Sequence, residues 1–300
     1  MCIICTKNLS ELKGLKELDC STCLNITSIP LIEGLEKLDC SNCSNITTIP
    51  VIKGLKELNC SRCINLTFIP VIEGLRLLNC RYCPKLIKIP HIDWLTTLKC
   101  ISCVKIKYIP NIKGLENLYC TFCSNLVYIP NIKGLKTLSC SVCRNLTVIP
   151  RIQTLKLLIC SLCPNLLNIP VIYGLEELRF SACSKITVIP KLKNLSVLHC
   201  NKTNITKIPQ FNNLIELRCV DCPNLISMEH QPKLNELWCQ GSTRFVYDIG
   251  NLYCLSKECK WIREGFRNNI MSLLKIQRHF RKILPKLRIK RYLRLLEHVQ

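Results

Sequence analysis

Apolar and polar positions repeat along residues 15–240 with a period of twenty. In the copy that begins at residue 15, apolar residues or cysteines stand at positions 15, 18, 20, 23, 26, 29 and 32. The alternation of Leu18 and Cys20 with the polar Glu17 and Asp19 predicts a short strand. After Cys20 the spacing becomes three, which fits neither a longer strand nor a 3.6-period helix. The pattern therefore predicts a chain that turns repeatedly around a narrow interior.

The second half of each copy carries the dipeptide Ile-Pro, ending at Pro30, at every twentieth residue as far as Pro190, and at Pro209. Proline fixes φ and lacks an N–H donor, so we expect an extended, polyproline-like return path and no regular helix. Stacked copies, here called rungs, would form one parallel sheet with strands about 4.8 Å apart. A glycine precedes the strand in seven rungs, where we expect tight corners with unrestricted φ: Gly14, Gly34, Gly54, Gly74, Gly114, Gly134 and Gly174.

The repeated pattern L-x-x-L-x-C-x-x-C-x-N-[LI]-x-x-I-P resembles the cysteine-containing variant of the leucine-rich repeat. The short period and the Ile-Pro pair resemble the twenty-residue bacterial type, and similar cysteine-rich arrays occur in large DNA viruses. The resemblance covers roughly residues 2–240. It implies a leucine-rich repeat solenoid with parallel β-strands on its concave face and an extended convex side. We accordingly divide the chain into a repeat array, residues 1–240, and a basic helical C-terminal region, residues 241–300.

Cysteines occupy two fixed positions in the rungs. The first cysteine position holds Cys20, every twentieth residue to Cys160, then Cys200, Cys219 and Cys239; the second holds Cys23, every twentieth residue to Cys183, then Cys222. In the resembling family these positions take an inward leucine and an inward asparagine that satisfies the backbone where the strand turns away. Thr203 stands at one second position in a rung one residue shorter, and Phe180 stands at one first position. A metal ligand would not tolerate such exchanges, so we expect core thiols and no metal or cofactor.

Composition and charge add constraints on partners and compartment. Apolar residues make up 48% of the chain, and 42 Lys and Arg against 20 Asp and Glu give a net charge of +22. Such a charge favours acidic surfaces, nucleic acid or anionic lipid. The start of the chain lacks the features of a secretory signal, and no run of about 18 apolar residues indicates a membrane span. We therefore expect an intracellular, reducing compartment, most simply the cytoplasm, in which the cysteines stay thiols. The repeat begins almost at once, so the first rung is expected to be open.

Residues beside the inward leucine of each strand are the candidate partner-binding residues, because repeat proteins commonly bind on this face. The column that follows the leucine runs from acidic to basic: Asp19, Asp39, Asn59, Asn79, Lys99, Tyr119, Ser139, Ile159, Arg179, His199, Arg218 and Trp238. We expect Tyr119, Ile159 and Trp238 to be exposed anchors for a partner. A solvated face with drift between copies explains the column equally well.

The period fails after Cys239, and helical spacing follows from residue 252, where we expect the α-helical cap that an open array end requires. Nine basic and no acidic residues lie between positions 275 and 294: Lys275, Arg278, Arg281, Lys282, Lys286, Arg288, Lys290, Arg291 and Arg294. The stretch IQRHFRKILPK resembles an IQ motif, the target helix of calmodulin-type proteins, with matching residues Ile276, Gln277, Arg281 and Lys286. Lys282 replaces the usual glycine, and Pro285 departs from the pattern. The tail could also serve only as a cap, or bind anionic lipid or nucleic acid.

No catalytic motif and no phosphate-binding loop is evident in the sequence. The function that we predict is a non-enzymatic protein-interaction scaffold whose concave sheet binds a protein, with no small-molecule substrate. A first alternative is binding of nucleic acid, an anionic membrane or an EF-hand protein through the basic tail. A second alternative is an adaptor for an enzyme such as a ubiquitin ligase.

Overall fold

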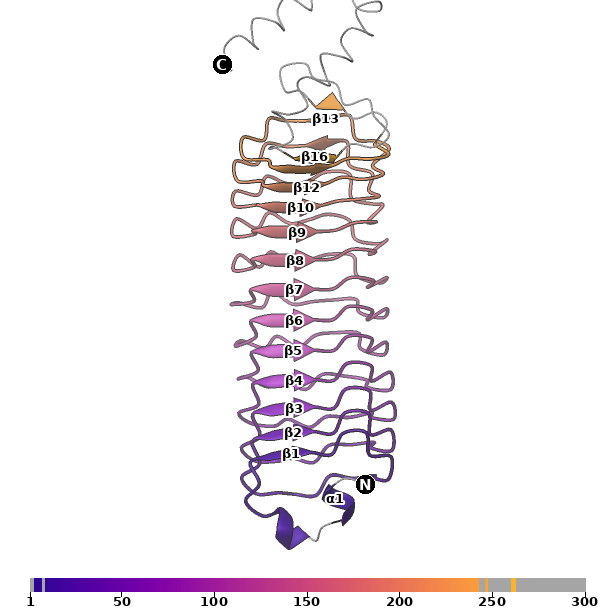
Figure 1. The fold of residues 1–300 in the computed structure, drawn as a ribbon, viewed down its shortest axis with the longest axis vertical. Coiled ribbons are helices and arrows are strands. Elements are labelled where there is room, and N and C mark those ends of the chain that lie inside the picture. The colour runs from indigo at the N-terminus through magenta and orange to yellow at the C-terminus, as the bar shows by residue number, and fades with distance from the viewer. Residues whose placement is uncertain (1–2, 7–8, 243–245, 248–259, 263–300) are drawn as a thin grey trace, which may run out of the picture.

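The computed structural model describes residues 3–6, 9–242, 246–247 and 260–262 as a stack of short strands (Figure 1). A 13-stranded sheet runs along the stack, parallel except for its last strand, β16, which pairs antiparallel with β14. Its strands are β1 (Glu17–Asp19), β2 (Lys37–Asp39), β3 (Glu57–Asn59), β4 (Leu77–Asn79), β5 (Thr97–Lys99), β6 (Asn117–Tyr119), β7 (Thr137–Ser139), β8 (Leu157–Ile159), β9 (Glu177–Arg179), β10 (Val197–His199), β12 (Glu216–Arg218), β14 (Glu236–Trp238) and β16 (Lys260–Ile262).

The register of the parallel strands places equivalent residues of successive rungs side by side. Leu18 pairs with Leu38, and the match persists from β10 to β12, where the short rung puts Leu198 opposite Leu217. The missing residue is therefore absorbed outside the strands. Residues at the predicted spacing of three are buried in every described rung, so the rungs share one continuous core. The prediction of a leucine-rich repeat solenoid with a parallel sheet is confirmed by this geometry.

The return path of the described rungs is extended and contains no helix, as predicted. It forms a second, discontinuous ladder, with isolated parallel bridges between Thr48 and Phe68 and between Tyr108 and Tyr128. Near the C-terminal end this ladder becomes a three-stranded parallel sheet of β11 (Lys207–Ile208), β13 (Ser227–Met228) and β15 (Val246–Tyr247). Several rungs are thus tied to the next on both sides of the core.

Two of the predicted glycine corners differ from the others. Gly34, with φ of 76°, shows the left-handed conformation that we expected at such corners. The prediction is wrong for Gly114 and Gly174, whose φ is not positive. A Cβ at Gly174 would lie 2.9 Å from the carbonyl oxygen of Gln153, so close approach of the preceding rung excludes a side chain there.

A second left-handed position precedes the second cysteine position and was not predicted. Eleven non-glycine residues among those described adopt φ between 55° and 62° at this site: Thr22, Asn42, Arg62, Tyr82, Ser102, Phe122, Val142, Leu162, Ala182, Lys202 and Asp221. Such a conformation costs an L-residue about 1–2 kcal/mol. Each of these N–H groups donates to a carbonyl of the next rung, as Thr22 does to Ser41 at 2.7 Å. The turn therefore continues the ladder beyond the strand, which offsets its strain.

Short helices cover the first rung, contrary to the expectation that it is open. They are α1 (Ile3–Thr6) and the 3-10 helix η1 (Leu9–Leu12), and they lie beyond β1 at the N-terminal end of the stack (Figure 1). Leu12 is buried in the core, and Ile4 packs against it. The predicted helical C-terminal region is wrong where the structure describes it, because residues 246–247 and 260–262 form the strands β15 and β16 and extend the two ladders. The rest of the predicted helical cap lies outside the described residues. None of the helices in the described part of the chain has the length and apolar character of a membrane span.

Candidate functional site

The thiols at the second cysteine position act as hydrogen-bond donors to the neighbouring rung. Sγ of Cys43 lies 3.1 Å from the carbonyl oxygen of Cys20, at the first position of the preceding rung. The same contact recurs along the array, from Cys63 to Cys183 and again at Cys222, at 3.0 to 3.3 Å. A weak S–H donor thus satisfies a buried carbonyl at the point where each strand ends. The second cysteine position was predicted to satisfy the backbone where the strand turns away, and this role is confirmed.

Two rungs use a hydroxyl where the others use this thiol. Thr203 Oγ1 donates to the carbonyl oxygen of Cys200 within its own rung at 2.6 Å. Ser242 Oγ donates to the carbonyl oxygen of Cys219 in the preceding rung, also at 2.6 Å, and accepts from the N–H of Cys222 at 3.1 Å. The sequence analysis missed Ser242, whose only signal is a C-x-x-S in the place of C-x-x-C. Thr203 and Ser242 show that the second cysteine position holds a small side chain that donates a hydrogen bond.

The first cysteine position is mainly apolar, although Sγ of Cys20 donates to the carbonyl oxygen of Asp39 and Sγ of Cys200 to that of Arg218, each at 3.4 Å. Burial raises the pKa of the Cys160, Cys200 and Cys219 thiols well above the ordinary value, so they remain neutral at physiological pH. Phe180 occupies this column in one rung and is fully buried. Among the described residues, no three His, Cys, Asp or Glu side chains converge in a way that could hold a metal ion. The two cysteine columns contribute packing and hydrogen bonds to the core.

The N-terminal part of the candidate column serves the turns. Asp39 Oδ1 accepts the N–H of Ser41 at 2.9 Å, and its Oδ2 accepts from Asn59 Nδ2 at 2.7 Å. Asp19 makes the same contact with Ser21, and this hydrogen bond lowers the pKa of the Asp19 carboxyl. Asn59 and Asn79 also accept an N–H two residues ahead. The side-chain oxygens of these four candidates thus accept backbone N–H groups of the turns that follow their strands.

The C-terminal part of the column forms a connected cluster. His199 Nε2 and Arg218 Nε both contact Glu216 Oε1, at 2.9 and 2.6 Å. The Arg218 guanidinium lies over the Trp238 ring, 5.3 Å from its centroid. One strand earlier, Arg179 pairs with Glu177 of the same strand. Three strands, β10, β12 and β14, therefore contribute to a connected group of charged and aromatic side chains on the sheet face, and the Arg179–Glu177 pair lies on the neighbouring β9.

The charge state of this cluster follows from its partial burial. Burial lowers the pKa of His199 and outweighs the hydrogen bond to Glu216, which acts in the opposite direction. Burial alone would raise the pKa of Glu216, but hydrogen bonds with His199 and Arg218 hold it below its usual value. At neutral pH the cluster therefore combines a neutral imidazole, a carboxylate and a guanidinium.

The predicted apolar anchors are less exposed than expected. Tyr119, Ile159 and Trp238 are half-buried, as is Lys99 at the centre of the column, because neighbouring strands cover their sides. The exposed large apolar side chains of the described residues lie instead on the turns, corners and return path, for example Ile87 and Tyr108. This exposed apolar surface on the turns, corners and return path was not predicted from the sequence.

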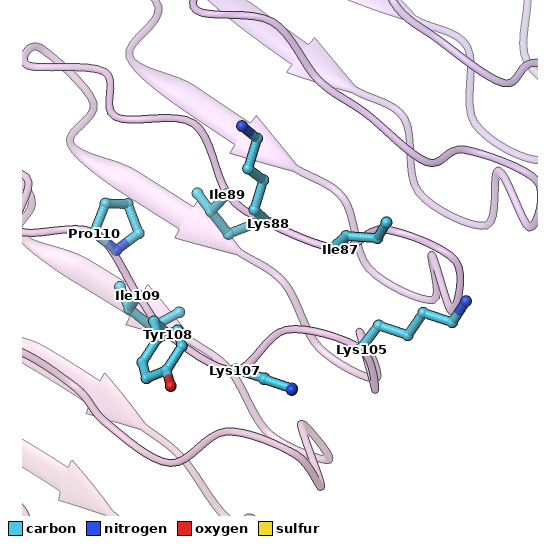
Figure 2. Close-up of a pocket in the computed structure, with 8 residues that line it drawn as sticks. All are labelled: Ile87, Lys88, Ile89, Lys105, Lys107, Tyr108, Ile109 and Pro110. Atoms are coloured by element: carbon cyan, nitrogen blue, oxygen red, sulfur yellow. The ribbon is translucent and has the colours of Figure 1, made fainter.

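A shallow hollow opens on the return path between the fourth and fifth rungs. It has a volume of about 420 Å³ and is lined by Ile87, Lys88, Ile89, Lys105, Lys107, Tyr108, Ile109 and Pro110 (Figure 2). Three of these eight residues are lysines, and none is acidic. The predicted basic tail and the IQ-like stretch lie outside the described residues, and their roles stay predictions.

Comparisons with known proteins were made with family models, curated proteins and solved structures. No protein-family model and no curated protein matches the chain. Among solved structures the chain is similar to a leucine-rich repeat protein from Bacteroides ovatus ATCC 8483, with 17% sequence identity and a TM-score of 0.47. The match covers 80% of this chain and 64% of that one, so this chain spans less than two thirds of its length. The similarity to viral arrays stays a prediction.

Proposed function

We propose that this chain is a non-enzymatic scaffold that binds a protein partner on its sheet face. The observation that carries the proposal is the cluster of His199, Glu216, Arg218 and Trp238, whose side chains hold one another in place. Binding a flexible side chain costs about 0.5–1.5 kcal/mol in lost rotamer freedom. A cluster that is ordered before binding avoids much of this cost.

The residue types of the cluster suit a protein interface. Tryptophan and arginine are enriched among the residues that contribute most to protein–protein binding. Asp19, Asp39, Asn59 and Asn79 are instead occupied by their own turns. We therefore place the centre of the binding site at β9, β10, β12 and β14, and not along the whole column.

The dimensions of the sheet require that the site include the turns beside it. Twelve parallel strands at about 4.8 Å spacing give a face on the order of 55 Å long, and three-residue strands make it only about 10 Å wide. A stable protein interface buries roughly 800 Å² on each partner. The strands of the cluster therefore supply part of that area, and the flanking turns must supply the rest.

The test is affinity capture with the full chain under reducing conditions, followed by quantitative mass spectrometry. The informative variant is Arg218→Gln combined with Trp238→Ala. Its matched control is Arg151→Gln combined with Trp94→Ala, which removes the same residue types from exposed corners outside the sheet face. We expect at least one partner to be lost from the first variant and kept by the control. Identical partner sets for the two variants would refute the proposed site.

A further inference from the structure

In part of the return path the charged residues are exclusively basic, and they lie in five of eleven successive rungs. We define the return arcs as the residues between the second cysteine position and the following apolar-proline step: 24–28, 44–48, 64–68, 84–88, 104–108, 124–128, 144–148, 164–168, 184–188, 204–207 and 223–227. These eleven segments contain no Asp or Glu. Their basic residues are Lys85, Lys88, Lys105, Lys107, Arg144, Lys185 and Lys207.

The outward positions of the parallel strands have the opposite tendency. They carry seven acidic residues against four basic ones: Glu17, Asp19, Asp39, Glu57, Glu177, Glu216 and Glu236 against Lys37, Lys99, Arg179 and Arg218. Within the array, acidic residues therefore outnumber basic ones on the strands and are absent from the return arcs. A high overall lysine content alone would not separate the two signs in this way.

The return arcs also carry most of the exposed apolar surface. Of the 21 large apolar side chains exposed in the described residues, twelve lie on the arcs: Leu24, Ile64, Phe68, Ile87, Val104, Tyr108, Val127, Tyr128, Val148, Leu167, Val188 and Ile226. Ile87 and Tyr108 are each 61% exposed, and Val188 is 68% exposed. Exposed apolar groups that adjoin one another on a protein surface mark interaction sites.

Backbone and side-chain contacts hold neighbouring arcs in register at several points of the array, so their side chains form a strip. The N–H of Val127 donates to the carbonyl of Lys107 at 3.0 Å, beside the bridge between Tyr108 and Tyr128. Asn65 Nδ2 donates to the carbonyl oxygen of Ser44 at 2.9 Å, and Lys85 Nζ donates to Asn65 Oδ1 at 2.6 Å. Side chains of one arc thus lie directly beside those of the next.

Basic and apolar groups meet most closely at the hollow between the fourth and fifth rungs. Figure 2 shows Lys105, Lys107 and Tyr108 on one rung beside Ile87 and Lys88 of the preceding one. The ion pairs among the described residues do not include Lys88, Lys105 or Lys107. Their ammonium groups are therefore not neutralised by a described carboxylate.

From this arrangement we infer that the return arcs bind the surface of an anionic lipid bilayer. Lysines beside exposed aliphatic and aromatic side chains suit the boundary between headgroups and acyl chains, where both kinds of group gain contacts. The absence of acidic residues over eleven arcs removes repulsion from the anionic headgroups. The ordered strip would let many rungs contact one membrane surface, leaving the sheet face available for a protein partner.

The apolar composition favours lipid over nucleic acid. A single-stranded nucleic acid needs aromatic rings on which its bases stack. Only Phe68, Tyr108 and Tyr128 among the twelve exposed apolar residues of the arcs are aromatic, and Lys88 already lies over the Phe68 ring, 5.7 Å from its centroid. The other nine are aliphatic and offer no stacking surface, whereas all twelve can partition into a bilayer interface.

The test is sedimentation of the full, reduced chain with vesicles of phosphatidylcholine alone or mixed with phosphatidylserine. We expect binding only to the mixed vesicles, weakening as salt rises. A lysine near such a surface contributes about fivefold to the partition coefficient. The variant Lys88→Glu, Lys105→Glu, Lys107→Glu should therefore bind on the order of 100-fold more weakly.

The control for charge is the variant Lys53→Glu, Lys133→Glu, Lys193→Glu. It makes the same change in net charge at exposed corner positions outside the arcs, and we expect much stronger binding to remain. Equal losses for the two triple variants would show attraction by net charge alone and overturn the inference. Loss of all binding when only the tail lysines and arginines are neutralised would likewise overturn it, because the tail would then be the lipid-binding element.

A second variant tests the apolar contribution without changing charge. Ile87→Ser combined with Tyr108→Ser removes two of the most exposed arc side chains. We expect several-fold weaker binding to mixed vesicles and an unchanged circular dichroism spectrum. Undiminished binding would contradict insertion of the arcs. Tighter binding of a single-stranded oligonucleotide than of mixed vesicles, with the same dependence on Lys88, Lys105 and Lys107, would assign the arcs to nucleic acid instead.

Discussion

The Sγ atom of Cys103 donates a hydrogen bond to the carbonyl oxygen of Cys80, 3.0 Å away in the preceding rung. The pair shows the different requirements of the two cysteine positions. The donor at the second position meets a defined acceptor, whereas the side chain at the first position fills apolar space. Substitutions at the two positions should therefore follow opposite rules.

At the second position, a hydroxyl should replace the thiol better than a methyl group does. We expect Cys103→Ala to lower the free energy of unfolding by about 1–3 kcal/mol, because the carbonyl oxygen of Cys80 loses its donor. Cys103→Ser should cost less, as the natural Thr203 and Ser242 suggest. Urea unfolding of the reduced proteins measures both values. A serine variant less stable than the alanine variant would contradict the hydrogen-bond role.

At the first cysteine position, an apolar replacement should be less destabilising than a hydroxyl. Cys160 is fully buried, so Cys160→Ser places a hydroxyl in an apolar environment at a cost of about 1–3 kcal/mol. Cys160→Val keeps the volume apolar and should cost less, since Phe180 shows that the column accepts larger apolar groups. The same urea titration compares the two. Equal or greater stability of Cys160→Ser would show that this thiol also needs a polar replacement.

The left-handed turn position offers a stabilising substitution. Val142 has φ of 59°, which is costly for a β-branched residue. We expect Val142→Gly to raise the free energy of unfolding by roughly 0.5–1 kcal/mol, because glycine adopts this conformation freely but loses more entropy on folding. Val148→Gly is the matched control, since Val148 is exposed and has no positive φ, and it should destabilise the protein. Destabilisation by both changes would show that the turn is not strained.

One thiol pair should oxidise before the others. Cys5 is exposed, and its Sγ lies 3.4 Å from Sγ of the buried Cys23. Oxidised glutathione should join these two sulfurs in a disulfide and release two molecules of reduced glutathione. Non-reducing peptide mapping over time would identify the first bond formed. Cys5→Ser should delay oxidation, and a first bond within the buried columns would contradict this order.

The sheet-face cluster should make stability depend on pH. Burial lowers the folded-state pKa of His199 below the ordinary value of 6.5, so the unfolded chain binds this proton more readily. Stability should therefore fall as pH drops below about 6.5 and level off beneath the folded-state pKa. His199→Gln should reduce this dependence in urea titrations between pH 8 and 5. An unchanged profile in the variant would assign the dependence to other groups.

Much of the fold could be predicted from the sequence, because the same physical requirements recur in every rung. The buried column at Leu18 and its equivalents, the turn after Cys20 and the extended path through Pro30 each appear in nearly every copy. The structure confirms each of these interpretations.

Other features could not be predicted, because they depend on contacts and not on residue type. The left-handed position holds residues as different as Thr22 and Phe122, since the ladder hydrogen bond fixes the backbone whatever the side chain. Asp39 looked like a binding residue, but its carboxylate accepts from the turn. Leu12 occupies the repeat position of Ile32, whereas the cover that Ile4 adds comes from a short helix outside the repeat pattern.

The central claim is that the cysteine columns stabilise the array as packing groups and hydrogen-bond donors. The most direct measurement is urea unfolding of reduced protein, purified without oxidants, with and without a strong zinc chelator, alongside elemental analysis. We predict that the midpoint is the same in both conditions and that metal content does not track folding. Stoichiometric zinc whose removal unfolds the array would contradict the account.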